Sequence, residues 1–267
     1  MKVVNHVIYY QSKTEKFLIV PFGDLHVGNR NADLRKIREI ANWIRETPKC
    51  YWLGMGDYVD AIVWHPNEKR IDPDIVDYRY YKPEDAYEFI YRLFEPIKNK
   101  CLGLLTGNHD DILRKRHYKD WVKDLAQRLN VPYLTFSAFL RLSFRLQYNN
   151  ERPKNQEFVI FATHGYYTGR STGGKVTRLE SLAQWIEADI YLMAHTHELL
   201  GHRRIVLAAS RGGRVIEKKK VFALTGGFLR GYVNEHSYVE KRLLAPTKIG
   251  ILSIEIEPWR RDIHVKE

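Results

Sequence analysis

The feature that most constrains the fold is an alternation of apolar strands and helices in the first half of the chain, with polar motifs between them. Three apolar runs have the length and composition of buried strands, at 17–22, 51–55 and 101–106. Three segments carry apolar side chains at helical spacing, at 33–45, 85–97 and 118–129. This order predicts parallel β-α-β units, whose functional side chains gather at the carboxyl ends of the strands.

The second half is richer in strands. Its strand patterns lie at 133–148, 158–163, 190–194, 205–208, 215–224 and 248–257, with one helix at 177–188. At the amino end, strands at 3–10 and 17–22 flank a polar turn, and we expect them to form a hairpin. We therefore predict one domain over residues 1–267, with two sheets packed face to face and helices outside.

One long connection, at about 60–83, has no clear period. Connections of this length are often functional, and this one is either a lid over a substrate or a surface excursion that packs its own aromatic side chains.

The chain is basic, with 43 Lys and Arg against 32 Asp and Glu, which gives a net charge of +11. This excess favours anionic partners such as nucleic acid or phosphorylated molecules, although it also fits a generally basic solvated surface. No apolar run approaches the roughly 20 residues that span a bilayer, so we expect no membrane insertion. The two cysteines, Cys50 and Cys101, exclude a disulfide framework and favour a cytoplasmic location.

Five short motifs follow the strands and carry the chemistry. They are Asp24-Leu-His26, Gly56-Asp57-Tyr-Val-Asp60, Gly107-Asn108-His109-Asp110, Thr163-His164-Gly165 and Ala194-His195-Thr-His197. On extended backbone, residues two apart point to one side, so each Asp-x-His or His-x-His pair is expected to bind metal together. Imidazole and carboxylate ligands without thiolate favour Mn, Fe, Zn or Co. Seven candidate ligands suit two ions about 3.5–4 Å apart that share a carboxylate.

This series resembles the calcineurin-like metallophosphoesterase family, whose pattern is D-x-H, G-D-x-x-D, G-N-H-D/E, H and G-H-x-H. The resemblance implies an α/β fold, a four-layer α/β/β/α sandwich, and hydrolysis of phosphate esters by a hydroxide that two metals activate. It implies a first metal on Asp24, His26 and His197, a second on Asn108, His164 and His195, and Asp57 as the bridge. We expect Mn²⁺, with Fe, Zn or Co as alternatives.

The resemblance also implies that His109 stabilises the transition state or protonates the leaving oxygen, and that Asp60 orients it. Three positions depart from the pattern. Ala194 replaces the usual Gly, while Ala61 and Asp110 replace the Arg and Glu of protein Ser/Thr phosphatases. These departures disfavour a phosphoprotein phosphatase, and the DNA-repair nuclease and phosphatase branches both stay open. For Asp110, a helix N-cap or turn is as good an interpretation as a chemical role.

The segment from Gly169 to Lys175 has the spacing of a nucleotide-binding P-loop, but Val176 replaces the Ser or Thr that would hold Mg²⁺. We expect a flexible basic loop beside the metals instead, with Arg170, Lys175 and Arg178 as substrate-phosphate contacts. Further cations near the cleft are expected from Lys69, Arg70 and 114–116.

The leading functional prediction is a phosphodiesterase or nuclease with nucleic acid as its partner. The alternatives are a phosphomonoesterase on nucleotides or phosphoproteins and a catalytically silent, metal-loaded scaffold. The complete set of ligand positions and His109 disfavours the scaffold.

Overall fold

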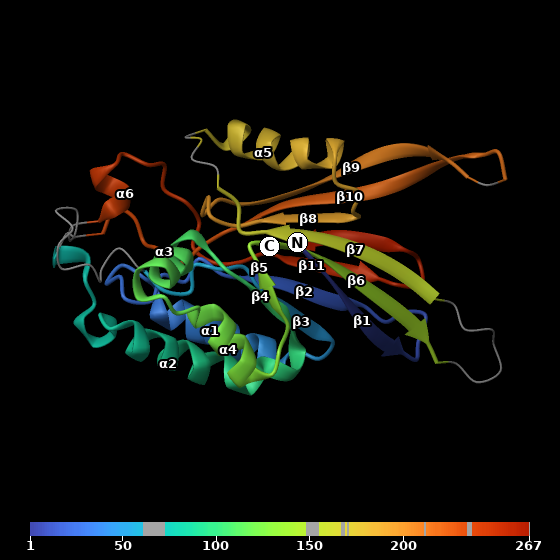
Figure 1. Ribbon diagram of the computed structural model, residues 1–267. Coiled ribbons are helices and arrows are strands. Elements are labelled where there is room, and N and C mark those ends of the chain that lie inside the picture. Colours follow the sequence, from blue (N-terminus) through green and yellow to red (C-terminus); the bar gives the residue numbers. More distant parts are fainter. Residues whose placement is uncertain are drawn as a thin grey trace.

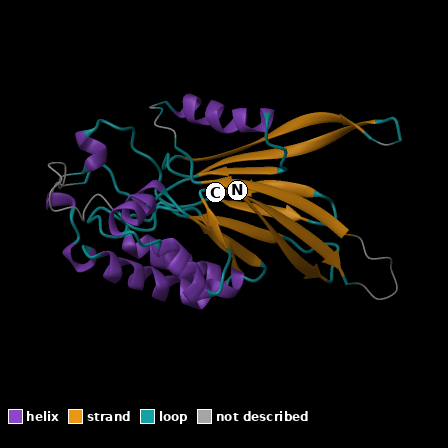
Figure 2. Ribbon diagram, in the orientation of Figure 1, coloured by secondary structure: helices purple, strands orange, loops and turns teal. Residues whose placement is uncertain are grey.

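Two six-stranded sheets pack face to face in this computed structural model, which describes residues 1–60, 73–147, 155–166, 169, 171–210, 212–233 and 237–266. Sheet I has the strand order β12-β11-β2-β3-β4-β5, and sheet II has the order β1-β6-β7-β8-β10-β9. Both are mixed, and helices lie outside them (Figures 1 and 2). The predicted four-layer α/β/β/α sandwich is confirmed.

Sheet I contains β2 (Phe17–Phe22), β3 (Cys50–Gly54), β4 (Cys101–Leu105), β5 (Tyr133–Thr135), β11 (Ser253–Glu257) and β12 (Asp262–Lys266). Sheet II contains β1 (Lys2–Tyr10), β6 (Ser137–Leu146), β7 (Asn155–Thr163), β8 (Ile190–Met193), β9 (Leu199–Ala209) and β10 (Val215–Thr225). The helices are α1 (Leu34–Glu46), α2 (Pro83–Phe94), α3 (Asn108–His117), α4 (Trp121–Leu129), α5 (Thr172–Ser181) and α6 (Tyr238–Lys241).

The core has three apolar layers. Helices α1, α2 and α4 cover the outer face of sheet I, where Trp52 packs on Phe94. Between the sheets lie buried side chains from both, such as Leu53 and Phe158. Helix α5 covers sheet II, where Leu179 belongs to a third cluster (Figure 1). These layers bury the apolar stripe of each helix against a sheet, as the helical spacing predicts. In the part of the chain that the structure describes, no helix has the length and apolar character to cross a bilayer.

The hairpin predicted for 3–10 and 17–22 is wrong. β1 pairs in parallel with β6 in sheet II, whereas β2 pairs with β3 and β11 in sheet I. β2 is buried along almost its whole length, as expected of a central strand, and β3 and β11 occupy its two edges, so β1 cannot pair with it. The turn between them is closed by Glu15, whose carboxylate accepts hydrogen bonds from the backbone N–H groups of Gln11 and Ser12.

Other boundaries differ from the sequence prediction. The strand expected at 133–148 splits at Phe136 into β5 in sheet I and β6 in sheet II, where Thr135 has a φ of 63°. Helix α3 and strand β12 were not predicted. The helix expected at 177–188 begins at Thr172, so Lys175 lies in a helix and not in a flexible loop.

The long connection is described only in part. Residues 61–72, with Lys69 and Arg70, lie outside the described residues, and 73–83 contains two short 3-10 helices, Pro73–Ile75 and Tyr78–Tyr80.

Candidate metal centre

The predicted ligands come together because both sheets end at one edge. β2, β3 and β4 run parallel in sheet I, and β7 and β8 run parallel in sheet II. The segments that follow these strands carry all seven candidate ligands, with Asn108 as the first residue of α3 and the others in loops: Asp24, His26, Asp57, Asn108, His164, His195 and His197. The centre is therefore assembled from both sheets.

The first group consists of Asp24, His26 and His197, whose ligand atoms lie within 4.8 Å of one another. The Nε2 atoms of the two histidines are 3.0 Å apart, and Asp24 Oδ1 lies 3.9 Å and 3.7 Å from them. Asp24 Oδ1 is buried and accepts no hydrogen bond from any described residue. A buried carboxylate oxygen without a donor fits a site for a cation.

The second group consists of Asp57, His164 and His195, joined by Asn108. Asn108 Oδ1 lies 2.9 Å from His164 Nε2 and 2.7 Å from His195 Nδ1. Asp57 Oδ2 lies 3.2 Å from His164 Nε2 and 3.9 Å from His26 Nε2, which belongs to the first group. Asp57 thus stands between the two groups.

The ligands meet through left-handed backbone, not through extended backbone as we expected. Five of them have positive φ values: Asp24 (50°), His26 (48°), Asp57 (48°), His195 (68°) and His197 (54°). Such conformations cost non-glycine residues about 1–3 kcal/mol each and persist where the surroundings hold them.

Hydrogen bonds between the loops hold this strained backbone. Asp24 N–H donates to the carbonyl of Gly56 at 2.9 Å, and His195 N–H donates to Asp24 Oδ2 at 2.9 Å. The second of these bonds ties a ligand loop of sheet I to one of sheet II.

His109 lies beside both groups. Its Nδ1 is 3.0 Å from Asp60 Oδ1, and its backbone N–H donates to Asp57 Oδ1 at 2.8 Å. Asp60 Oδ2 in turn accepts a hydrogen bond from Asn29 Nδ2 at 2.8 Å. Asn29 was not predicted, because an isolated Asn three residues after His26 carries no spacing signal. His109 also forms a third group with His26 and Asp57 within 4.8 Å.

Asp110 is neither an N-cap nor a turn residue. It is the third residue of α3, and its Oδ2 accepts hydrogen bonds from the backbone N–H groups of Asp57 (2.8 Å) and Gly107 (2.9 Å). Its Oδ1 accepts from the hydroxyl of Tyr87 at 2.7 Å. Only glycine fits at position 107, because a Cβ there would overlap the Asp57 carboxylate. Tyr87 was not predicted, because it lies on the apolar face of α2 like an ordinary core residue.

Burial and neighbouring opposite charges shift the pKa values of the ligands and of His109 in opposite directions. Burial raises the pKa of Asp24 to about 7 and lowers the pKa of His26 to about 4. Burial alone would raise the pKa of Asp57, but the imidazoles of His164 and His109 outweigh it and hold that pKa well below its usual value. Burial opposes protonation of His109, yet Asp57 and Asp60 raise its pKa to about 9.

Of the predicted substrate contacts, Lys175 is engaged in an ion pair. Lys175 has only 12% of its side chain exposed and pairs with Glu198 at 2.9 Å, beside the His195–His197 segment. Arg178 is exposed on α5, and Arg170 lies outside the described residues. On α3, Arg114 and Lys115 both pair with Asp111, at 2.6 Å each.

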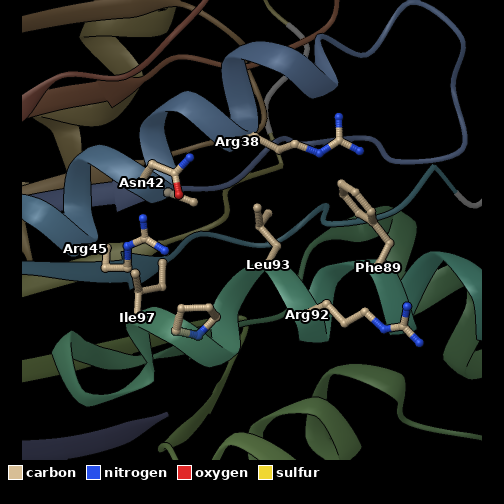
Figure 3. Close-up of a pocket in the computed structure, with 9 residues that line it drawn as sticks. Arg38, Asn42, Arg45, Phe89, Arg92, Leu93 and Ile97 are labelled. Atoms are coloured by element: carbon tan, nitrogen blue, oxygen red, sulfur yellow. The ribbon is translucent and has the colours of Figure 1, made fainter.

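Two other features lie apart from the centre. A pocket between α1 and α2 is lined by Arg38, Asn42, Arg45, Phe89 and Arg92, among others, and contains none of the predicted ligands (Figure 3). A further group of potential ligands lies on β11 and β12 and consists of Glu255, Glu257 and His264. Its two carboxylates are already paired with cations, because Lys16 lies 3.2 Å and 2.6 Å from them and Lys266 lies 3.6 Å from Glu255.

Comparison with solved structures finds remote similarity. A metallophosphoesterase from Sphaerobacter thermophilus shares 12% identity over 94% of this chain and 87% of its own, with a TM-score of 0.38. A predicted phosphoesterase from Streptococcus pneumoniae shares 14% identity over 91% and 83%, with a TM-score of 0.33. Wild-type Vps29 complexed with Zn²⁺ from Entamoeba histolytica shares 12% over 94% and 97%, with a TM-score of 0.33. At this similarity none of the three bears on function.

No curated protein matches the chain. The family model of calcineurin-like phosphoesterases, however, matches residues 17–199. This segment begins at the first residue of β2 and includes all seven candidate ligands, His109 and Asp60. The chain therefore belongs to the calcineurin-like phosphoesterase family and is a metal-dependent hydrolase of phosphate esters.

Proposed function

We propose that the centre binds two divalent metals and hydrolyses phosphodiesters, with polynucleotides as substrates. The position of Asp57 carries the two-metal proposal, because its Oδ2 lies close to a histidine of each group. Asp24, His26 and His197 would hold the first metal, and Asn108, His164 and His195 the second. Asp57 would bind both.

The donor set supports this assignment. All seven ligands offer imidazole nitrogen or a side-chain oxygen. Among the described residues none donates a hydrogen bond to the buried Asp24 Oδ1, and a bound cation would be its partner. Two bound cations, for which we propose Mn²⁺ with Fe, Zn or Co as alternatives, would supply an activated water and neutralise the phosphoryl oxygens.

His109 is proposed to give a proton to the leaving oxygen. Its Nδ1 is held by Asp60, and Asn29 fixes the other oxygen of that carboxylate. This chain of hydrogen bonds sets the orientation of the imidazole, and Asp60 favours its protonated form.

The choice of polynucleotides rests on charge. The net charge of +11 would attract a polyanion, and α3 carries both His109 and the basic residues 114–116. Since two of those cations already pair with Asp111, the exposed Arg178 is the better candidate for a phosphate contact. We also propose a cytoplasmic location, because Cys50 and Cys101 are buried free thiols.

The deciding experiment compares bis-p-nitrophenyl phosphate with p-nitrophenyl phosphate in the presence of Mn²⁺. A diesterase prefers the first substrate, and a nuclease also cleaves labelled oligonucleotides in a reaction that His109→Ala slows strongly. Preference for the monoester, with no oligonucleotide cleavage, would replace the proposal by a phosphomonoesterase acting on nucleotides or phosphoproteins. No hydrolysis of either ester with both metals bound would favour the scaffold.

A further inference from the structure

Tyr166 presents an exposed aromatic ring next to the second ligand group. It follows the ligand His164 by two residues, and 87% of its surface is exposed. Its ring lies nearly parallel to the imidazole of His195, with an angle of 14° and a centroid distance of 6.3 Å. The ring thus lies close to a metal-ligand side chain, and most of its surface is open to solvent.

Phe136 adds a second exposed aromatic residue to the same side of the centre. Its carbonyl accepts a hydrogen bond from the backbone N–H of His164 at 3.1 Å. This bond lies next to the Ser137–Thr163 pair, at the end of the β6–β7 ladder. It is 48% exposed. Near the first ligand group, the backbone N–H of Phe228 bonds to the carbonyl of Asp24, and this ring is fully buried in the core.

Accessible aromatic surface is therefore found beside the Asn108, His164 and His195 group. In the free protein the apolar surface of an exposed ring faces water. A ligand that covers this ring removes that surface from water, which favours binding. Phosphate esters of sugars or of serine have no flat group to cover it. Nucleobases do, and every base has a π-face that stacks on an aromatic side chain without sequence preference.

We propose that Tyr166 stacks on a nucleobase next to the scissile phosphate, with Phe136 lining the same rim. The inference rests on the proposed hydrolysis of nucleic-acid esters and deepens it, because it names the side chain that binds the base. Tyr166 is a substrate-binding residue in this account, and the phosphoryl chemistry stays with the metals and His109.

The test measures kcat/KM with Mn²⁺ for a thymidine dinucleotide and for its base-free analogue, which has the same sugars and the same phosphodiester. Tyr166→Ala should lower kcat/KM for the dinucleotide by about 5- to 150-fold, the range expected for stacking of one base on an aromatic side chain. It should leave the base-free substrate and the metal content unchanged. Tyr166→Phe and Tyr166→Trp, which keep a ring, should retain the preference for the base.

Tyr9→Ala is the matched control. Tyr9 is also an exposed tyrosine, at 54%, but it pairs with Arg145 at the opposite end of sheet II, about 26 Å along β6 from Ser137. This variant should behave like the wild type on both substrates.

Two results would overturn the inference. Equal losses on both substrates would mean that Tyr166 only supports His195, and no loss on either would mean that it does not contact the substrate. Should the wild type hydrolyse only monoesters, the diesterase proposal fails by itself. The same variants then decide the stacking role on thymidine 5′-monophosphate against base-free deoxyribose 5-phosphate.

Discussion

At the residue scale, the centre is a set of side chains on strained backbone that buried hydrogen bonds hold in place. Asp57 illustrates both, since it has a φ of 48° and its backbone N–H is held by Asp110. Asp110 is in turn held by Tyr87, whose ring stacks on Trp121. A ligand fixed in this way needs little rearrangement when a metal binds.

We predict that Tyr87→Phe destabilises the protein. The change removes the hydroxyl that donates to the buried Asp110 carboxylate and leaves the Trp121 stacking intact. A buried acceptor that loses a donor costs about 1–3 kcal/mol in the free energy of unfolding. Urea unfolding measures the change, with Tyr9→Phe on the exposed face of β1 as control. Equal stability of the two variants would show that the Tyr87 bond contributes nothing.

We also predict that His109→Ala separates catalysis from metal binding. His109 bonds to Asp60 and is assigned no metal, so turnover should fall by roughly 10²–10⁴-fold, as is typical when a general acid is lost. Metal content should not change. Because His109 also lies within reach of His26 and Asp57, loss of a metal from this variant would make it a ligand and refute the assignment.

At the element scale, the sequence predicted which segments form helices and buried strands better than it predicted their partners. The apolar period of α1 and the runs of β2, β3 and β4 were sufficient to place the motifs at strand ends. The sheet to which β1 belongs was not predictable, because turn residues do not show whether a chain reverses within one sheet or crosses to another.

The missed features of the site have a similar cause. Helix α3 has few apolar positions, so its period is weak, and its start depends on Asp110 bonding to Gly107. The left-handed backbone of the ligand residues cannot be predicted from residue type, because it depends on contacts between loops of the two sheets. Tyr87 and Asn29 were missed because their partners, Asp110 and Asp60, are distant in sequence.

Helix α1 offers a test of local stabilisation near the centre. Asp33 caps it by accepting from Lys36 N–H at 3.0 Å, and it pairs with Arg230 at 2.7 Å. Asp33→Ala should lower the free energy of unfolding by about 1–2 kcal/mol. Asp33→Asn should lower the free energy of unfolding by less than Asp33→Ala does, because an amide oxygen can still cap the helix.

The difference between wild type and Asp33→Asn should depend on pH. Burial alone would raise the pKa of Asp33, but the hydrogen bond from Lys36 and the pairing with Arg230 outweigh it and lower that pKa. The carboxylate therefore stabilises the fold above the unfolded pKa, about 3.9, and its contribution is lost as the pH falls through the folded pKa. Thermal unfolding from pH 7 to pH 3 measures this, and a difference that grows on acidification would contradict the role of the ion pair.

At the scale of the whole molecule, the centre joins the two sheets. Asp24 and Asn108 follow strands of sheet I, while His164, His195 and His197 follow strands of sheet II. Each proposed metal would therefore have ligands from both sheets, and binding would stabilise the sandwich as a unit.

The net charge leads to a prediction about polyanions. If the +11 charge serves nucleic-acid binding, fluorescence anisotropy with labelled oligonucleotides should show an affinity that falls steeply with salt. The log-log slope on duplex DNA is about −0.9 for each phosphate neutralised. Arg178→Ala should make the slope shallower by about one such unit. Lys49→Ala is the control, because Lys49 pairs with Glu15 in the turn between β1 and β2. No binding even at low salt would remove nucleic acid as the partner.

If seven ligands bind two metals and share Asp57, the number of metal ions bound per chain must be two. Metal-free protein is reconstituted with excess Mn²⁺, and the bound metal is counted by elemental analysis and located by anomalous scattering. We predict two ions per chain in the wild type, and weakening of both sites in Asp57→Asn because the shared charge is lost. One ion per chain at saturating Mn²⁺, or an Asp57→Asn variant that keeps both ions at unchanged affinity, would contradict the account.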